Sequence, residues 1–228
     1  MRILLIGHGR MGRLVGDLSA EYGCEVAGII DPQSPLHAGP LDERWRGVDV
    51  AIDFSFPNAV KTNVEGVARL GMNAVIGTTG WQGDEASVRR TVADAGIGVV
   101  AAPNFSVGVM IFEAIAARAA ALFAAHQTFG AFLHEAHHVA KKDAPSGTAL
   151  LLKKTIEEAG FSRPIDVSST RAGYLPGTHT VGFDGPAETI TLTHAARDRS
   201  AFARGALTAA QWVKGRSGWF TMRDVLGV

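Results

Sequence analysis

The chain has 228 residues, enough to bury the core of one large domain or two small ones, and its 22 basic residues balance 22 acidic ones. This balance excludes an overall field that would favour nucleic acid or a membrane surface. The single cysteine, Cys24, excludes an internal disulfide framework, and the four apolar residues before Gly7 are too few for a secretory or membrane-spanning segment, so we expect a cytoplasmic protein.

Short β-branched runs alternate with segments of helical spacing over residues 1–101. The predicted strands are Ile3–Ile6, Val26–Ile30, Val50–Phe54, Ala74–Ile76 and Ile97–Ala101, and the predicted helices are Met11–Tyr22, Asn58–Leu70 and Glu85–Ala95. Ser55 and Pro57 indicate the start of the second helix, through a cap and an early proline. Strands that are apolar nearly throughout and alternate with helices predict an α/β fold whose parallel sheet is covered on both faces.

The alternation ends after Pro103. The predicted elements are then a helix at Val107–Ala125, a strand at Phe129–Ala136, a helix at Ser146–Ala159 and strands at Ile165–Arg171, Thr178–Phe183 and Thr189–His194. This order favours an α+β layer with a mixed or antiparallel sheet. A last helix, Phe202–Lys214, is expected to pack back on the first domain because it carries Trp212. We therefore expect one domain at 1–104 and 203–228 and another at 105–202.

A glycine motif follows the first strand, with the sequence Gly7-His8-Gly9-Arg10-Met11-Gly12. G-x-G-x-x-G is a weak signal alone, but here it follows a strand and opens a helix, as a dinucleotide-binding loop does. Gly7 permits the tight turn, Gly9 lets the backbone approach a pyrophosphate, and Gly12 lets helix and strand pack closely. Arg10 could add a contact to phosphate. The alternative is a plain strand-turn-helix with incidental glycines.

Asp31 ends the second predicted strand, where an acidic side chain can accept hydrogen bonds from ribose hydroxyls. It would repel a 2′-phosphate, and no arginine follows it directly, so we predict that NADH is preferred over NADPH. The alternative is a turn residue before Pro32.

Two further loops lie at the ends of predicted parallel strands, where such sheets bind ligands. Their small residues, hydroxyls and backbone N–H groups suit a nicotinamide and its ribose. These loops are Gly77-Thr78-Thr79-Gly80 and Ala102-Pro103-Asn104-Phe105-Ser106.

Proton donors and acceptors are concentrated in residues 135–149, directly before a predicted helix. His137, His138 and Lys141 suit a proton relay beside a bound dianion, because histidine titrates near neutrality and lysine can donate a proton. Gly147 and Thr148 at the helix start could bind a carboxylate through a main-chain N–H and a hydroxyl. Together these residues predict a site that grips and protonates an anionic substrate.

Two other interpretations of this stretch remain. His134, His137 and His138 are close enough in sequence to suggest a metal site, but His134 should point away from its neighbours if its segment is a strand, and no cysteine lies nearby. We expect no metal. The remaining alternative is a solvated polar loop capped by Ser146.

The pattern Glu135-x-His137-x-x-x-Lys141-x-Asp143-x-Pro145-Ser146-Gly147-Thr148-Ala149 resembles the signature of the 4-hydroxy-tetrahydrodipicolinate reductase (dihydrodipicolinate reductase) family. The resemblance extends over almost the whole chain. It includes the motifs Gly7–Gly12, Gly77–Gly80, Pro103–Val109 and Met222–Leu226.

The resemblance implies a Rossmann-like nucleotide domain, a mixed α/β domain for substrate binding and assembly, and a homotetramer. It assigns acid/base roles to His137 and Lys141, with Lys141 rather than Lys142 as the proton donor. His138, Gly147 and Thr148 would bind substrate carboxylates, and Arg199 would add a cationic contact. The implied cofactor residues are Gly7, His8, Gly9, Arg10, Met11, Gly12, Asp31, Gly77, Thr78, Thr79, Ala102, Pro103, Asn104 and Phe105.

The implied reaction is the NAD(P)H-dependent reduction of a cyclic unsaturated dicarboxylate to tetrahydrodipicolinate, in the diaminopimelate route to lysine. Three positions depart from the family pattern: Ala140 replaces a histidine, Phe132 a frequent glutamate, and Phe56 an arginine that some members place near the 2′-phosphate. The last departure again favours NADH.

Two other functions compete with this one. A homoserine- or aldehyde-type dehydrogenase could share the domain order, but an aldehyde enzyme needs a catalytic cysteine and Cys24 is badly placed for that. A non-enzymatic NAD(H)-sensing module would leave His137 and Lys141 without a purpose.

Overall fold

The computed structural model describes residues 1–228, and the chain folds into two units. The first unit contains Met1–Val107 and Ser200–Val228, and the second contains Gly108–Arg199. The chain therefore leaves the first unit once and returns to it. The assignment of cofactor to the first unit and substrate to the second stays a prediction.

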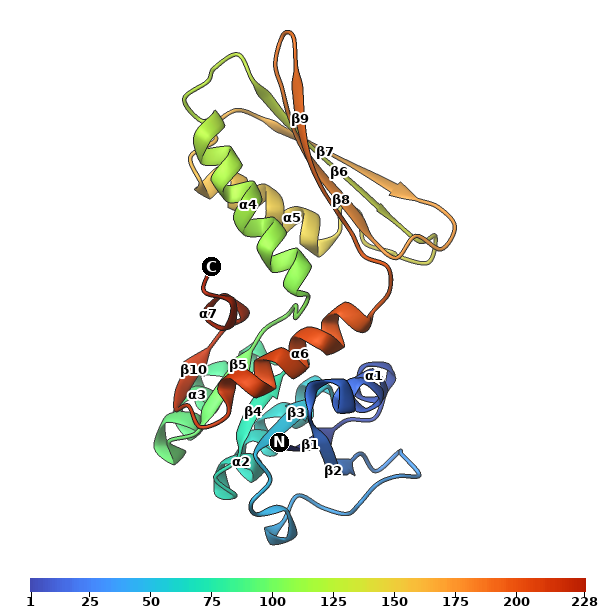
Figure 1. Ribbon diagram of the computed structural model, residues 1–228, viewed down its shortest axis with the longest axis vertical. Helices are drawn as coiled ribbons and strands as arrows, with labels where there is room; N and C mark the ends of the chain where they lie inside the picture. The colour runs from blue at the N-terminus through green and yellow to red at the C-terminus, as the bar shows by residue number, and fades with distance from the viewer. The chain divides into compact units, whose positions relative to one another are not determined.

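The first unit is built on a six-stranded sheet in the order β10-β5-β4-β3-β1-β2, with all neighbours parallel (Figure 1). Its strands are β1 (Arg2–Ile6), β2 (Glu25–Ile30), β3 (Val50–Asp53), β4 (Asn73–Ile76), β5 (Gly98–Ala101) and β10 (Gly218–Phe220). Its helices are α1 (Arg10–Leu18), α2 (Val60–Arg69), α3 (Glu85–Ala95), α6 (Ser200–Val213) and α7 (Met222–Leu226), with short 3-10 turns at Ser19–Tyr22, Glu43–Trp45, Pro57–Ala59 and Gln82–Asp84. The predicted Rossmann-like parallel sheet is confirmed.

Helices cover both faces of this sheet, as its nearly continuous apolar strands require. Val64, Val67, Val88 and Val92 of α2 and α3 pack into a core with alternate residues of β1, β3 and β4. Helices α1 and α6 contact each other, and α6 also lies against β3, β4 and β5. Strand order reverses at β1, so the loops that follow β1 and β3 flank one crevice at the carboxyl end of the sheet.

The start of the second predicted helix differs from the sequence prediction. Phe56 is the N-cap of the 3-10 turn that begins at Pro57, and it makes no side-chain cap bond. The Ser55 hydroxyl instead donates to Asp53 Oδ1 at 2.7 Å. The early proline was predicted correctly, but the cap at Ser55 was wrong because a buried carboxylate competes for that hydroxyl.

The second unit contains a four-stranded sheet in the order β7-β6-β8-β9. Its strands are β6 (Gly130–His137), β7 (Ile165–Arg171), β8 (Thr178–Asp184) and β9 (Thr189–Ala195), and its helices are α4 (Val107–Phe123) and α5 (Gly147–Glu158). β6 pairs with β7 in parallel and with β8 antiparallel, and β8 pairs with β9 antiparallel. The predicted mixed sheet is confirmed.

Both helices of the second unit lie on one face of its sheet (Figure 1). Phe112 of α4 and Leu152 of α5 pack there with Leu133 of β6 and Phe183 of β8. Because side chains alternate along a strand, Glu135 and His137 lie on the same covered face as Leu133. The apolar face of β6 therefore ends in a buried polar pair. No helix in the chain is long and apolar enough to cross a membrane.

Candidate active site

The glycine loop after β1 has the backbone geometry that a pyrophosphate-binding turn requires. Gly7 has a φ of +88°, and a Cβ there would lie 2.5 Å from the Phe54 carbonyl oxygen. A Cβ at Gly12 would lie 2.0 Å from the Gly7 carbonyl oxygen, whereas a Cβ at Gly9 would have no heavy atom within 4 Å. Gly7 and Gly12 are therefore fixed by packing, and Gly9 faces open space.

Helix α1 begins at this loop without a side chain that satisfies its first N–H groups. Gly9 is the N-cap, it makes no side-chain cap bond, and the first turn contains no acidic residue. The first N–H groups of a helix have no intrahelical partner and form the positive end of its dipole. The start of α1 is thus suited to an anion, with Arg10 and Met11 beside it.

Asp31 lies at the end of β2 and is tied to the glycine loop. Its Oδ2 accepts from the His8 backbone N–H at 2.7 Å, and its Oδ1 accepts from the Gln33 N–H at 2.9 Å. Each carboxylate oxygen keeps a second lone pair for a further donor. Asp31 thus fixes the loop and can still accept a ribose hydroxyl.

Two cavities lie along the crevice of the first unit. One, of about 370 Å³, is lined by Gly7, His8, Gly9, Arg13, Asp31, Gln33, Ser34, Phe54, Ser55 and Phe56. The other, of about 390 Å³, is lined by Gly9, Arg10, Met11, Phe54, Ser55, Pro57, Gly77, Thr78 and Thr79. They share Gly9, Phe54 and Ser55, so the predicted phosphate loop lies where they adjoin.

Asp53, which was not predicted from the sequence, connects two of the loops that line this crevice. It is buried at the end of β3 and accepts from the hydroxyls of Ser55 and Thr78 at 2.7 and 2.8 Å and from the Asn63 amide at 2.8 Å. It therefore joins the loop after β3 to the loop after β4. Its place at a strand end was the available signal.

The loop after β5 contributes less open surface than predicted. Ala102 and Pro103 line a third cavity of about 180 Å³, whereas Asn104 and Phe105 line none of these three. The Asn104 side chain accepts from the Ser106 N–H at 2.8 Å, and Phe105 is only 2% exposed. Any cofactor contact by Phe105 would have to come from its backbone.

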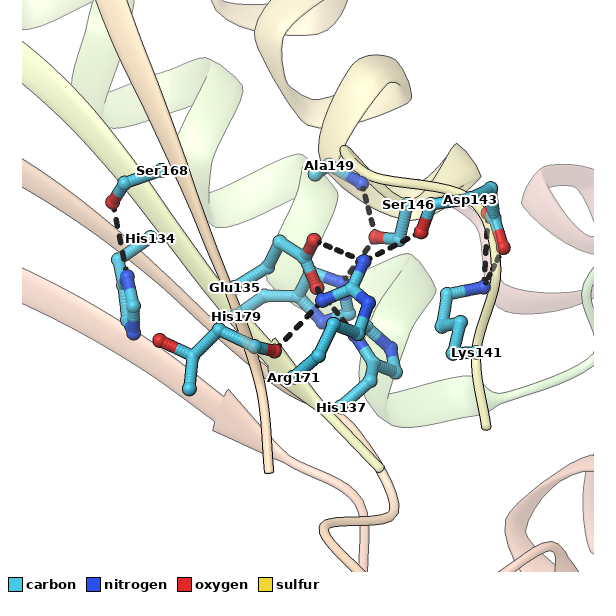
Figure 2. Close-up of polar contacts among 11 residues, drawn as sticks. His134, Glu135, His137, Lys141, Asp143, Ser146, Ala149, Ser168, Arg171 and His179 are labelled. Carbon is cyan, nitrogen blue, oxygen red and sulfur yellow. Dashed lines mark hydrogen bonds and ion pairs between the residues drawn. The ribbon is translucent and has the colours of Figure 1, made fainter. Parts of the chain in front are cut away.

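In the second unit, His137 is held by a buried ion pair. His137 Nδ1 forms a hydrogen bond with Glu135 Oε2, and the Arg171 guanidinium donates to Oε2 at 3.0 Å and to Oε1 at 2.7 Å (Figure 2). Glu135 is fully buried. Burial would raise the pKa of Glu135, but hydrogen bonds from Arg171, Ser169 and His137 lower it to about 2. Glu135 is therefore a carboxylate at all physiological pH values.

His179 of β8 lies beside this pair. Its ring centroid is 5.1 Å from that of His137, and its Nε2 is 3.0 Å from the Ser146 hydroxyl. Burial, together with the nearby His137, lowers the pKa of His179 to about 4, so its ring is neutral at pH 7. Its Nδ1 is buried without a hydrogen-bond partner.

Lys141 extends from the loop after β6 and pairs with Asp143. The distances from Nζ to the two carboxylate oxygens are 2.8 and 2.9 Å (Figure 2). The hydrogen bond from Lys141 lowers the pKa of Asp143. The backbone N–H of Lys141 donates to the His138 carbonyl oxygen at 3.1 Å, which makes this segment a tight turn.

Helix α5 presents a second anion-binding helix start. Ser146 is the N-cap and accepts from the Ala149 N–H at 3.2 Å. Gly147 and Thr148 are the first two helical residues, the first turn contains no acidic residue, and a Cβ at Gly147 would have no heavy atom within 4 Å. The Gly147 N–H makes a hydrogen bond to the Asp143 carboxylate, which also pairs with Lys141. The start of α5 therefore already faces a carboxylate, as the positive end of a helix dipole favours.

His134 points away from this group, as its place on a strand predicted, and Arg199, implied as a substrate contact, lies elsewhere. His134 is on the other face of β6, where its Nδ1 is 3.0 Å from the Ser168 hydroxyl (Figure 2). Arg199 is exposed in the loop between β9 and α6, at the end of the second unit. The structure thus groups Glu135, His137, His179 and Ser146 rather than the three histidines of the metal alternative.

The grouped residues include a possible set of metal ligands. Glu135, His137 and His179 are buried, and each offers one ligand atom within 4.8 Å of the others. Such a donor set resembles that of zinc sites. However, Arg171 occupies both oxygens of Glu135, and its fixed positive charge would repel a divalent cation. The donor set does not suit a resident metal.

Comparison with known proteins agrees with this arrangement along the whole chain. Residues 1–105 match the family described as dihydrodipicolinate reductase, N-terminus, and residues 108–226 match dihydrodipicolinate reductase, C-terminus. The chain belongs to the dihydrodipicolinate reductase family. Members of this family are oxidoreductases that use a nicotinamide cofactor.

Two curated relatives illustrate the extent of the match. The 4-hydroxy-tetrahydrodipicolinate reductase of Rhodopseudomonas palustris (strain TIE-1) is 37% identical, over 100% of this chain and 98% of the relative. That of Methanoregula boonei is 38% identical, over 96% of this chain and 95% of the relative. Family membership disfavours both the homoserine-type dehydrogenase and the NAD(H)-sensing module.

A solved structure shares the fold. The dipicolinate-bound dihydrodipicolinate reductase from Paenisporosarcina sp. TG-14 superposes with a TM-score of 0.83 at 23% identity, covering 97% of each chain. An amine dehydrogenase from Mycobacterium smegmatis has a TM-score of 0.60 at 11% identity. At these identities the similarity concerns the fold alone.

Proposed function

We propose that this chain reduces 4-hydroxy-tetrahydrodipicolinate to tetrahydrodipicolinate with NAD(P)H, in the diaminopimelate route of lysine biosynthesis. The observation that carries the proposal is the segment 137–148, in which two proton-handling side chains directly precede a helix start that is suited to an anion. This segment belongs to a chain whose relatives carry the same activity in their names over their full length.

The crevice of the first unit would hold the cofactor. The start of α1 and the space at Gly9 suit its pyrophosphate, Asp31 suits the adenosine ribose, and Thr78 and Thr79 lie at the end expected for the nicotinamide. When bound there, the nicotinamide supplies the hydride. The protein contributes binding and orientation, through backbone groups for the most part.

The start of α5 would hold a substrate carboxylate. The N–H groups of Gly147 and Thr148 and the Thr148 hydroxyl can donate to it, and His138 and Arg199 would add positive or donor groups. These contacts would hold the substrate ring in a fixed position relative to the groups that react with it. Such positioning can contribute a large part of the rate enhancement.

Lys141 and His137 would supply the proton. Reduction of one ring double bond adds a hydride to one carbon and a proton to its neighbour, and the hydride carries both electrons but no proton. We assign donation to Lys141, with His137 as its partner in acid/base catalysis. Loss of the substrate hydroxyl as water accompanies the overall reaction.

The test is oxidation of NADH with the condensation product of pyruvate and aspartate semialdehyde, followed by absorbance. Lys141→Ala should lower kcat by about 10²- to 10⁴-fold, the usual contribution of a general acid, while NADH binding persists. Lys142→Ala is the matched control and should keep its turnover. Near wild-type kcat in Lys141→Ala would refute the donor assignment.

We propose NADH as the preferred cofactor. Asp31 would repel a 2′-phosphate, and Phe56, which lines the same cavity, offers no charge to it. Arg13 is the one arginine or lysine that lines this cavity, and its Nε donates to the His8 carbonyl oxygen at 3.2 Å. The ratio of kcat/KM for the two cofactors measures the preference, and a tenfold excess for NADPH would overturn it.

We also propose a cytoplasmic homotetramer that assembles through the second unit. No helix of that unit covers the face of the sheet that carries Phe132, His134 and Thr193. Sedimentation equilibrium measures the assembly. Replacement of Phe132 by Asp should shift it toward smaller species if this face is the interface.

A further inference from the structure

Arg171 contacts the residues that hold His137 and Lys141, the two proton-handling groups of the second unit. On one side its guanidinium donates to both oxygens of Glu135, which is bonded to His137 Nδ1. On the other side its Nη2 donates to the Asp143 backbone carbonyl oxygen at 2.6 Å, and the Asp143 carboxylate pairs with Lys141 Nζ. Figure 2 shows the Arg171 guanidinium between Glu135 and Asp143.

We propose that Arg171 is a positioning residue that sets His137, through Glu135, and the Lys141 loop, through the Asp143 carbonyl, in one geometry. The inference rests on the proposed function only for the roles of His137 and Lys141. The hydrogen bonds of the Arg171 guanidinium to Glu135 and to the Asp143 carbonyl do not depend on the substrate.

The first half of the linkage fixes the tautomer of His137. Glu135 is a buried carboxylate that can only accept, so His137 Nδ1 must carry the proton of their hydrogen bond. His137 Nε2 is then directed toward Gly177, whose φ is +139° and at which a Cβ would lie 3.0 Å from that nitrogen. Because residue 177 is glycine, no side chain there crowds His137 Nε2.

The second half of the linkage fixes the loop. Lys141 is four residues beyond the end of β6, and a strand alone does not determine where such a residue lies. Arg171 ends β7, which pairs with β6 so that Arg171 is opposite His137. The bond to the Asp143 carbonyl then ties the loop to the same sheet. A flat, five-donor guanidinium can satisfy both directions, whereas an ammonium group cannot.

Arg171→Lys is the decisive variant because it keeps the charge and removes the fork. We expect kcat to fall by about tenfold to 100-fold, because a small misplacement of a catalytic group has an effect of this size. KM for NADH should not change. Arg163→Lys is the matched control: Arg163 also anchors backbone, donating to the Phe129 and Phe123 carbonyls at 2.7 and 2.8 Å, but it contacts none of the site residues. The control should keep its kcat.

NMR of ¹⁵N-labelled histidine side chains tests the positioning role of Arg171 without substrate. The wild type should show a proton on His137 Nδ1 in a strong hydrogen bond, and Arg171→Lys should weaken or broaden that signal. Glu135→Gln serves if Arg171→Lys does not fold, and should weaken the His137 Nδ1 proton signal, because a neutral amide oxygen is a weaker acceptor than a carboxylate.

The outcomes separate the two proposals. If the wild type does not oxidise NADH with this substrate, the proposed function fails, and the NMR result still decides the positioning role. If Arg171→Lys keeps both the wild-type pH profile of kcat/KM and the His137 Nδ1 signal, the positioning role is wrong.

Discussion

The chain offers two helix starts to anions, and they are built in different ways. The start of α1 is surrounded by glycine and backbone, with Gly9 as an N-cap that makes no side-chain bond. The start of α5 has a serine cap and adjoins an ion-pair network of Glu135, Arg171, Lys141 and Asp143. A cofactor phosphate needs shape and N–H donors only, whereas a substrate that must also be protonated needs titratable groups nearby.

The largest expected effect tests the backbone-built site. Gly12→Ala should destabilise the first unit by about 3 kcal/mol or more, because its Cβ would lie 2.0 Å from the Gly7 carbonyl oxygen and the backbone must shift. Gly9→Ala is its control, since a Cβ there meets no atom within 4 Å. It should keep the unfolding midpoint in denaturant and weaken NADH binding measured by fluorescence titration. Equal stability of both variants would contradict the packing role of Gly12.

Local patterns predicted most of the fold because each long element carries its own period. The helix Glu85–Ala95 and the strand Ile165–Arg171 were predicted with their observed bounds. β10 and α7 were missed because elements of three and five residues are too short to show a period.

The network around His137 was only partly predictable. Glu135 lies two residues before His137 and so shares its face, a relation that strand periodicity contains. Arg171 and His179 meet Glu135 only through the register of β6 with β7 and β8. No local signal in the sequence sets that register, and the role of Asp31 as an acceptor for His8 likewise depends on the pairing of β1 with β2.

The next effect tests the titratable site through its stability. The pKa of His179 is about 4 when folded and near 6.5 when unfolded, so the unfolded chain binds more protons between these values. The free energy of unfolding should therefore fall as the pH drops from about 6.5 to 4, by about 3 kcal/mol at most. Urea melts at pH 7 and pH 4.5 measure it. His179→Gln should flatten the dependence, and an unchanged slope would contradict the prediction.

A smaller effect concerns the grip on the substrate. Thr148→Val removes the hydroxyl but keeps the shape and the backbone N–H, so KM for substrate should rise about tenfold while kcat changes little. Thr148→Ser restores the hydroxyl and is the matched control. Loss of kcat without a change in KM would show that Thr148 acts in the chemical step instead, and the start of α5 would no longer parallel that of α1.

The smallest effect separates exposed from buried charge within the second unit. The Asp143 carboxylate is 58% exposed, whereas Glu135 is fully buried, although each pairs with one cation of the site. Exposed ion pairs contribute little because water screens them. Asp143→Asn should therefore leave the unfolding midpoint in denaturant unchanged and alter kcat only a few-fold, since Arg171 bonds the backbone carbonyl of this residue and not its side chain. Steady-state or stopped-flow measurement of kcat for Asp143→Asn and for Glu135→Gln compares the two carboxylates. If Asp143→Asn lost as much activity as Glu135→Gln, the carboxylate itself would place Lys141, and the loop would depend on a side-chain pair rather than on the Arg171 anchor.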